Sequence, residues 1–267
     1  MSDVNSRYEL SRWTGMSALK FVLLVAVCAV ILASIQQVAP SPKQLASGAP
    51  GMVNLLDRMI PPNMDAAFLT RMAWRIFETF QIALAGAAIG IAISLPIGWL
   101  AAKQVTPIGR FGYLVKVLVS LLRTIPDLIW ALLFVATVGL GAVAGTMTIV
   151  MDTVGFCGRF FAEAMEDADK QPQEALSAVG ASRVSILFAA ILPDTAPSLI
   201  NTSLFALEQA VRSSVVLGLV GAGGIGQELK AAFDLFQYKN AATIILAIFA
   251  IVLLMELLTE RLRTLVK

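Results

Sequence analysis

The chain has 267 residues, of which 58% are hydrophobic and 14% are charged, with a net charge of +2 and a mean hydropathy of +0.80. Soluble domains carry about 25% charged residues and about 45–50% apolar ones, so this composition excludes an ordinary soluble protein and requires apolar surface to face lipid. The small net charge indicates no nucleic-acid partner, and the absence of histidine removes the usual general base and the commonest metal ligand.

The first element expected is a membrane helix over residues 18–38, after a cytoplasmic tail at 1–17. A bilayer core of about 30 Å requires roughly 20 apolar residues, and this run contains one charge, Lys20. A signal peptide is the alternative, because Arg7 and Arg12 precede the run. However, the run exceeds the about 7–15 residues of a signal core, and residues 39–42 form a poor cleavage site. We therefore expect an uncleaved helix.

The remaining elements indicate an all-α, polytopic membrane protein of about six transmembrane helices. Prolines interrupt residues 39–72, which we expect to form an extracytoplasmic loop with one amphipathic piece at 52–60 on the membrane surface. A permease core follows at 73–267, with spans near 73–102, 112–140, 141–161, 195–220 and 240–258. Gly139, Gly141 and Gly145 are expected to form the turn between the third and fourth spans.

Basic residues decide the orientation of these spans. With both termini cytoplasmic, twelve basic residues lie inside and six lie outside. The inner set is Arg7, Arg12, Lys20, Lys103, Arg110, Lys116, Arg159, Lys170, Arg183, Arg261, Arg263 and Lys267, and the outer set is Lys43, Arg58, Arg71, Arg75, Lys230 and Lys239. The residues at 39–72 and the glycine-rich run at 218–226 are then extracytoplasmic.

The polar break at residues 166–193 is the most informative segment. Pro172 suits the first position of a helix, and Glu174 in the first turn favours the positive end of its dipole. Gly180 suits the left-handed residue that ends it, and Ser182 suits the N-cap of a second helix that stops at Pro193. The first helix has a small apolar face, made of Ala175, Leu176, Ala178 and Val179. Such a face outside the membrane needs a partner surface, unless the segment is an ordinary interhelical loop.

This segment resembles the EAA loop of permeases in ATP-binding-cassette (ABC) importers. The family pattern is E-A-A, three residues, G, nine residues, then I-x-L-P. Its matching residues here are Glu174, Ala175, Gly180, Leu192 and Pro193. Leu176 replaces an alanine and Ala190 replaces an isoleucine, so the docking surface is expected to differ in detail at these two positions.

The resemblance implies the type I importer permease fold, with the loop docked in a groove of a nucleotide-binding subunit. It implies a homodimer with two ATP-binding subunits, an extracytoplasmic substrate-binding protein, and ATP with Mg on the partner ATPase. No cofactor is expected on this chain, which has no G-x-x-x-x-G-K-[ST] motif.

Three further stretches, at 122–127, 207–212 and 216–227, are similar to phosphonate-importer permeases. Two of them carry charges spaced i, i+4, Arg123 with Asp127 and Glu208 with Arg212. Either each pair neutralises itself along one helix face, or the arginines line the route of an anionic substrate such as a phosphonate. Phosphate, phosphite and methionine remain alternative substrates.

The third stretch contains a G-x-G-x-x-G pattern that suggests a dinucleotide-binding turn. That site needs a βαβ unit and an acidic residue about 20 positions on, whereas residues 245–247 are Ile-Leu-Ala. We expect instead a flexible re-entrant turn at the outer end of the fifth span, acting as a gate beneath the binding protein. Its glycines are Gly221, Gly223, Gly224 and Gly226.

Two other classes of protein fit the sequence less well. A membrane enzyme is disfavoured because the sequence offers no histidine, no metal cluster and no activated nucleophile; Cys28 and Cys157 lie in apolar stretches and form no C-x-x-C pair. A channel would have no use for the EAA-like loop. We therefore expect a transport subunit with no catalytic residue and no metal.

Overall fold

The computed structural model describes residues 18–103 and 105–265, so the tail expected at 1–17, with Arg7 and Arg12, lies outside the described residues. Within these residues the regular structure is helical and contains no strand. The all-α expectation is confirmed, and the dinucleotide-binding alternative lacks the strands that it needs. The chain divides into two units, Met1–Asp57 and Arg58–Lys267.

The first unit contains α1 (Ala18–Val38), with the bounds expected of the first span, and most of α2 (Pro42–Met59). None of the side chains described in α1 is buried, which leaves an apolar surface for lipid. The connection expected at 39–72 contains a longer helix than the amphipathic piece expected at 52–60, because α2 begins at Pro42 and continues through Pro50. The Ser41 N–H donates to Gln44 Oε1 at 2.9 Å and the Gln44 N–H to Ser41 Oγ at 3.2 Å, a capping box with Pro42 at the first helical position.

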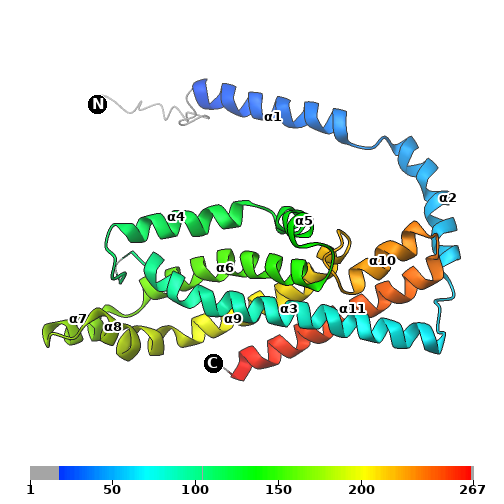
Figure 1. Ribbon diagram of the computed structural model, residues 1–267. Helices are drawn as coiled ribbons and strands as arrows, with labels where there is room; N and C mark the ends of the chain where they lie inside the picture. The colour runs from blue at the N-terminus through cyan, green and yellow to red at the C-terminus, as the bar shows by residue number, and fades with distance from the viewer. Residues whose placement is uncertain (1–17, 104, 266–267) are drawn as a thin grey trace, which may run out of the picture. The chain divides into compact units, whose positions relative to one another are not determined.

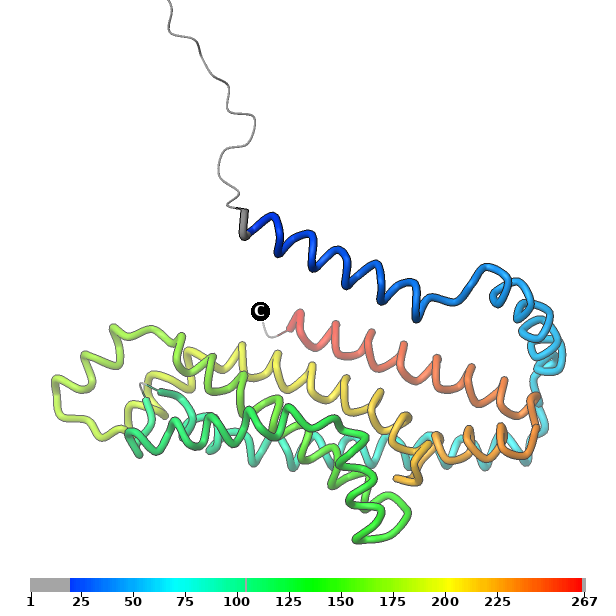
Figure 2. Tube along the Cα trace, turned by 90° about the horizontal axis from the view of Figure 1, so that it is seen from above, coloured from blue at the N-terminus to red at the C-terminus, as the bar shows by residue number. Residues whose placement is uncertain are grey.

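The second unit is a bundle of long helices joined by short ones (Figures 1 and 2). In chain order its elements are α3 (Ala66–Ala101), α4 (Phe111–Thr124), α5 (Asp127–Val138), α6 (Ala142–Asp167), α7 (Lys170–Ala178), α8 (Arg183–Ile186), the π-helical turn η1 (Leu187–Ile191), α9 (Leu192–Gly218), α10 (Ile225–Asp234) and α11 (Tyr238–Leu265). Both views place α7 and α8 at one end of the bundle and α10 towards the other.

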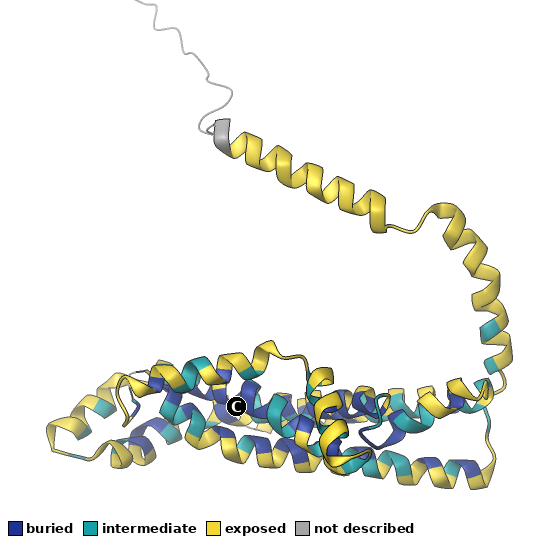
Figure 3. Ribbon diagram, turned by 45° about the horizontal axis from the view of Figure 1, so that its top comes forward, coloured by how far each residue is buried: buried dark blue, intermediate teal, exposed yellow. Residues whose placement is uncertain are grey.

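Helix α6 is the centre of the bundle and packs against α3, α4, α5 and α9. Its closest neighbour is α3, where a Cβ at Gly86 would lie 2.6 Å from Ile149 Cγ2 and one at Gly90 would lie 2.5 Å from Thr153 Cβ. Glycines at both positions let the two backbones approach closely, as is common between membrane helices. In Figure 3 the buried residues of this unit gather where its helices face one another.

Four of the described helices are long and apolar enough to cross a membrane: α1, α3, the continuous helix from Arg183 to Gly218, and α11. A fifth candidate is the bent pair α4–α5. The expected fourth span corresponds to α6, which lies outside this set because glycine, threonine and charged residues lower its hydropathy. The second span begins at Ala66, earlier than expected, because Asp65 caps it by accepting from the Phe68 N–H at 3.2 Å.

The span expected at 112–140 corresponds to the bent pair α4–α5 and not to one continuous helix. Helices α4 and α5 are separated by Ile125 and Pro126 and meet at 86°. A residue before proline is pushed out of the helical region, and Ile125 has an extended backbone with φ −88° and ψ 117°. The turn after α5 is as expected, with Gly139 at φ +100° and Gly141 at φ +129°, whereas Gly145 lies inside α6.

Candidate functional site: the EAA-like loop, the span charges and the glycine turn

The EAA-like loop projects from one end of the bundle as the short helices α7 and α8 (Figure 1). Helix α7 begins at Lys170, so Pro172 occupies the third helical position and not the first. The reason is Asp169, whose carboxylate accepts from the Gln171 N–H at 3.0 Å and caps the helix two residues earlier than expected. The Asp169 N–H in turn donates to Asp194 Oδ2 at 2.9 Å, which ties the start of α7 to α9.

The corner between the two short helices is built as the sequence predicts. Gly180 has φ +80°, a left-handed conformation that a side chain would strain. Ser182 caps α8, its Oγ accepting from the Ser185 N–H at 3.2 Å. Gly180 and Ser182 each act on the backbone within a few residues of themselves. The end of α7 and the start of α8 could therefore be predicted from the sequence.

The expected end of the second helix at Pro193 is wrong, because α8, η1 and α9 form one helix through this residue. Proline has no N–H and its ring crowds the carbonyl four residues back. The turn just before it is widened: the Leu192 N–H donates to the Leu187 carbonyl, five residues earlier. This π-helical turn accommodates Pro193 without stopping the helix.

The loop presents apolar side chains that the described part of the chain leaves exposed. No residue of α7 is buried. Val179, Val184 and Phe188 are 80%, 50% and 65% exposed. By contrast, Ala190 is buried in the packed part of η1, so this off-pattern position does not belong to the exposed surface. Leu176, the other off-pattern position, is half-buried. It therefore stays a candidate for a contact with the partner subunit.

Three polar contacts connect the segment at 166–193 to α4 and to the chain between α3 and α4. Glu166, in the last turn of α6 beyond its apolar stretch, accepts from the Lys103 N–H at 2.7 Å and from Lys116 Nζ at 2.9 Å. Burial opposes ionisation of Glu166, but these two contacts outweigh it and lower its pKa below the ordinary value. Arg183 of α8 donates to the Thr106 carbonyl at 2.6 Å. The loop is therefore attached to α4 as well as to α6 and α9.

The expected pair of Glu208 and Arg212 forms along α9. Glu208 is 7% exposed and also accepts from Arg263 Nη2 of α11 at 3.0 Å. Thr259 Oγ1 lies 3.4 Å from the same carboxylate. Sequence reasoning placed Arg263 only among the basic residues of the cytoplasmic side, since no local pattern connects residues 55 positions apart.

The expected pair of Arg123 and Asp127 does not form. Within residues 18–103 and 105–265, no carboxylate oxygen lies within 4.0 Å of the Arg123 guanidinium. Asp127 accepts from Ser213 Oγ of α9 at 3.0 Å instead. The i, i+4 rule applies to one continuous helix, and the break at Pro126 separates these residues. Arg123 lies over the rings of two phenylalanines of α6, with centroid distances of 5.9 Å to Phe156 and 5.5 Å to Phe160.

The glycine run forms the turn expected at the end of α9, and most of it is buried within the bundle. Gly223, Gly224 and Gly226 are buried. Gly221, Gly223 and Gly224 have φ values of +94°, +89° and +74°, which favour glycine. Gly226 serves another purpose: a Cβ there would lie 2.0 Å from the Val215 carbonyl oxygen, where α10 crosses the end of α9.

Hydrogen bonds hold this turn against α3 and the start of α6. The Gly221 carbonyl accepts from the Gly141 N–H at 2.9 Å and from Gln227 Nε2 at 3.0 Å. The Ile225 N–H donates to Thr79 Oγ1 of α3 at 2.7 Å. Two glycine turns, one after α5 and one after α9, thus meet at the level of Thr79, about 20 Å along α3 at about 1.5 Å per residue.

Replacing Thr79 with valine is expected to lower thermal stability. The Ile225 N–H would lose its acceptor in a buried position, which costs about 1–3 kcal/mol. Thermal unfolding of the purified protein in detergent measures the effect. Thr137→Val is the matched control, because Thr137 is exposed and bonds only carbonyls of its own helix. Equal midpoints for both variants would contradict the role of Thr79.

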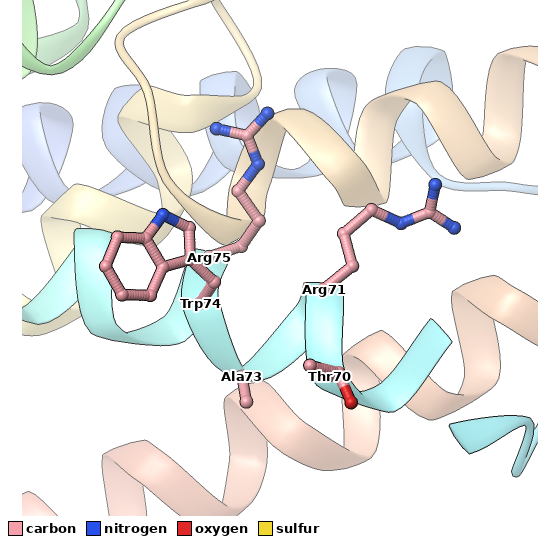
Figure 4. Close-up of a pocket in the computed structure, with 5 residues that line it drawn as sticks. All are labelled: Thr70, Arg71, Ala73, Trp74 and Arg75. Atoms are coloured by element: carbon pink, nitrogen blue, oxygen red, sulfur yellow. The ribbon is translucent and has the colours of Figure 1, made fainter. Parts of the chain in front are cut away.

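A hollow of about 790 Å³ lies on the first turns of α3, away from the loop and the span charges. Figure 4 shows Trp74, Arg71 and Arg75 projecting to one side of this helix. Arg75 is held by Glu78 at 2.7 Å and by Glu228 at 3.0 Å. Trp74 is 69% exposed, as is typical of aromatic residues at a membrane–water interface.

The helical bundle and its EAA-like loop define a multi-pass membrane protein with the type I ABC importer permease fold. The chain belongs to the family of binding-protein-dependent transport system inner membrane components, whose model matches residues 94–267. This family consists of transport permease subunits and not of enzymes.

Curated relatives include transporters of phosphorus oxyanions. The chain is 36% identical over 221 residues to the phosphite transport system permease of Stutzerimonas stutzeri, covering 82% of this chain and 79% of the relative. It is 37% identical over 212 residues to the phosphate-import permease of Mycolicibacterium smegmatis, covering 79% of this chain but only 40% of that longer protein. A putative cryptic phosphonate permease of Escherichia coli is 35% identical over 117 residues, covering 44% of this chain and 96% of the relative.

Solved structures support the fold. A methionine ABC transporter in an inward-facing conformation matches with a TM-score of 0.67 at 24% identity, covering 76% of this chain and 100% of the matched chain. An amino acid ABC transporter matches with a TM-score of 0.59 at 15% identity, covering 76% and 97%. The matched coverage confirms the expected fold class.

Proposed function

We propose that the chain is the permease of an ATP-driven importer that moves a phosphonate, or a related phosphorus oxyanion, into the cytoplasm. The exposed apolar side chains of the EAA-like loop carry this proposal, because they need a partner and lie in the segment that resembles the family's docking loop. The phosphite, phosphate and phosphonate relatives support an oxyanion as cargo. The alternative is the same machine with phosphate, phosphite or methionine as its solute.

The assembly that follows is a homodimer of this chain with two ATP-binding subunits and an extracytoplasmic substrate-binding protein. ATP and Mg are bound by the ATPase chains, and the permease holds no cofactor. Both termini then lie in the cytoplasm, since the excess of basic residues marks that side. The contacts of Glu166 and Arg183 with the α3–α4 connection support a lever that moves α4 together with α6 and α9.

The choice among oxyanions rests with the separate binding protein, so the first experiment measures what that partner binds. Isothermal titration with methylphosphonate, phosphite, phosphate and methionine is expected to give the tightest binding for a phosphonate. Uptake by the reconstituted transporter should follow the same order. Tight binding of methionine, with no binding of any phosphorus oxyanion, would overturn the proposed cargo.

Replacing Arg212 with glutamine is expected to reduce substrate uptake more than ATP hydrolysis. The change leaves Glu208 with Arg263 as its remaining ion-pair partner and removes one cation from α9. Uptake and ATPase activity would be measured on the same proteoliposomes. Arg159→Gln is the control, because its pair with Glu163 is exposed and lies on α6 alone. Wild-type uptake by the Arg212 variant would show that its pair is only structural.

A further inference from the structure

A second cavity, of about 510 Å³, lies among residues of α6, α9 and α11. It is lined by Phe156, Phe160, Asn201, Thr202, Phe205 and Arg263. The three aromatic rings form its apolar wall: the Phe156 ring lies 4.7 Å from that of Phe160 and stacks at 5.4 Å on that of Phe205. The cavity therefore combines an aromatic wall with two neutral polar side chains and one cation.

Two of the three polar side chains that line this cavity have no hydrogen-bond partner in the described part of the chain. Within residues 18–103 and 105–265, neither the Asn201 amide nor the Thr202 hydroxyl forms a hydrogen bond, although both side chains are partly buried. The neighbouring Ser203, by contrast, donates to the Leu199 carbonyl at 2.8 Å, which is the usual arrangement in a helix. Polar side chains within membrane spans are costly and normally face a partner or a water-filled path.

Two guanidinium groups lie against the same aromatic wall. Arg263 lies over the ring of Phe205 with a centroid distance of 5.8 Å, and Arg123 lies over Phe156 and Phe160. Arg263 Nη2 donates a hydrogen bond to Glu208. The Nε of Arg263 is buried and has no hydrogen-bond partner among the described residues. Arg123 forms no ion pair within 4.0 Å in the same residues, and Asp152 of α6 acts on it only at longer range.

The charge balance around Glu208 also favours an anion. One buried carboxylate is shared by two cations, Arg212 and Arg263, so this group carries one excess positive charge. The Arg212 and Arg263 side chains are 44% and 34% exposed, so an ion of opposite sign can reach them. The planar guanidinium of arginine can bind two oxygens of a tetrahedral oxyanion at once, whereas the compact ammonium of lysine acts as a single point charge.

We propose that this cavity is a transit site for an organophosphonate. The oxyanion is bound by Arg263 together with the Asn201 amide and the Thr202 hydroxyl, and Arg123, which lies over the Phe156 and Phe160 rings, adds positive potential. The carbon substituent of the phosphonate lies against Phe156, Phe160 and Phe205. This inference rests on the proposed function, and it deepens that function by favouring a substrate with an apolar group over inorganic phosphate.

The test uses the complete transporter in proteoliposomes, with its ATPase chains and binding protein, and methylphosphonate and phosphate as probes. The double variant Asn201→Leu with Thr202→Val is expected to lower methylphosphonate uptake about tenfold or more, because two donors are lost. ATPase activity stimulated by the binding protein should stay within about twofold, since neither side chain bonds to the rest of the described chain. Phe205→Ala should reduce the preference for methylphosphonate over phosphate.

A matched variant separates a transit role from structural damage. Ser203→Ala removes a neighbouring hydroxyl that is already bonded to the Leu199 carbonyl, so it should transport like the wild type. Wild-type uptake by the double variant, or equal losses of uptake and ATPase activity, would overturn the transit site. Failure of the wild-type transporter to take up either probe would overturn the proposed function instead.

Discussion

Deleting residues 174–180 is expected to abolish co-purification of the ATP-binding subunits with the permease. These residues form the exposed half of the EAA-like loop, including Val179, which is 80% exposed. Apolar side chains that a partner covers usually dominate the energy of an interface, so their removal should reduce association to background. Affinity purification of the tagged permease with its ATPase chains, followed by quantification of both, measures the effect.

The deletion should leave the permease itself folded, because no residue of α7 is buried and the bonds of Glu166 and Arg183 lie outside the deleted segment. Thermal unfolding in detergent should confirm this. Val179→Glu is a milder version that adds a charge to the same surface, and Gln171→Glu is its control on α7. Full recovery of the ATPase with the deleted permease would contradict the docking role, and solute flux without an ATPase would indicate a channel.

Gly226→Ala is expected to destabilise the permease strongly, although it adds only one methyl group. The new Cβ would lie 2.0 Å from the Val215 carbonyl oxygen and 2.9 Å from Gly218 Cα, both backbone atoms that cannot rotate away. Overpacking of this kind costs about 1–3 kcal/mol and more where backbone must shift. We expect a loss at the upper end of that range, seen as a large drop in the thermal midpoint and in the yield of the assembled transporter.

The control for Gly226 is Gly158→Ala on α6. A Cβ at Gly158 would meet Ile97 Cγ2 at 3.4 Å and Val119 Cγ1 at 3.5 Å, which is ordinary van der Waals contact. Its midpoint should stay close to that of the wild type. A thermal midpoint of Gly226→Ala equal to that of Gly158→Ala would contradict this prediction. The packing where α9 and α10 cross would then have to be looser than the structure shows.

The sequence was sufficient where a short pattern determines the geometry. Apolar runs predicted α1 and the long helices, since length and composition alone decide whether a helix can cross lipid. Gly180 and Ser182 predicted the corner of the EAA-like loop, because a left-handed residue and an N-cap act within one turn. The resemblance of that loop to the EAA pattern then indicated the family to which the chain belongs.

The sequence was insufficient where distant residues or backbone adjustments determine the outcome. Pro193 was expected to end a helix, but a π-helical turn accommodates it. Pro126, within the span expected at 112–140, bends that span and separates Arg123 from Asp127. Arg263 reaches Glu208 from α11, a contact that depends on how two helices pack.

The glycine run is another feature that the sequence predicts only in part. Its composition predicted a turn correctly, because three of its glycines have positive φ. Its burial depends on Thr79 and Gly141, which come from other parts of the chain. A pattern of small residues fits a mobile loop and a tightly packed one equally well, and only the surrounding helices decide between them.

ATP-dependent accumulation of methylphosphonate tests the central claim most directly. The complete transporter would be placed in proteoliposomes with ATP on the side of the EAA-like loop and the loaded binding protein on the opposite side. We predict uptake against a concentration gradient that requires both ATP and the binding protein and that is lost when residues 174–180 are deleted. Uptake that continues without ATP, or that stops at equal concentrations on the two sides, would contradict an ATP-driven importer.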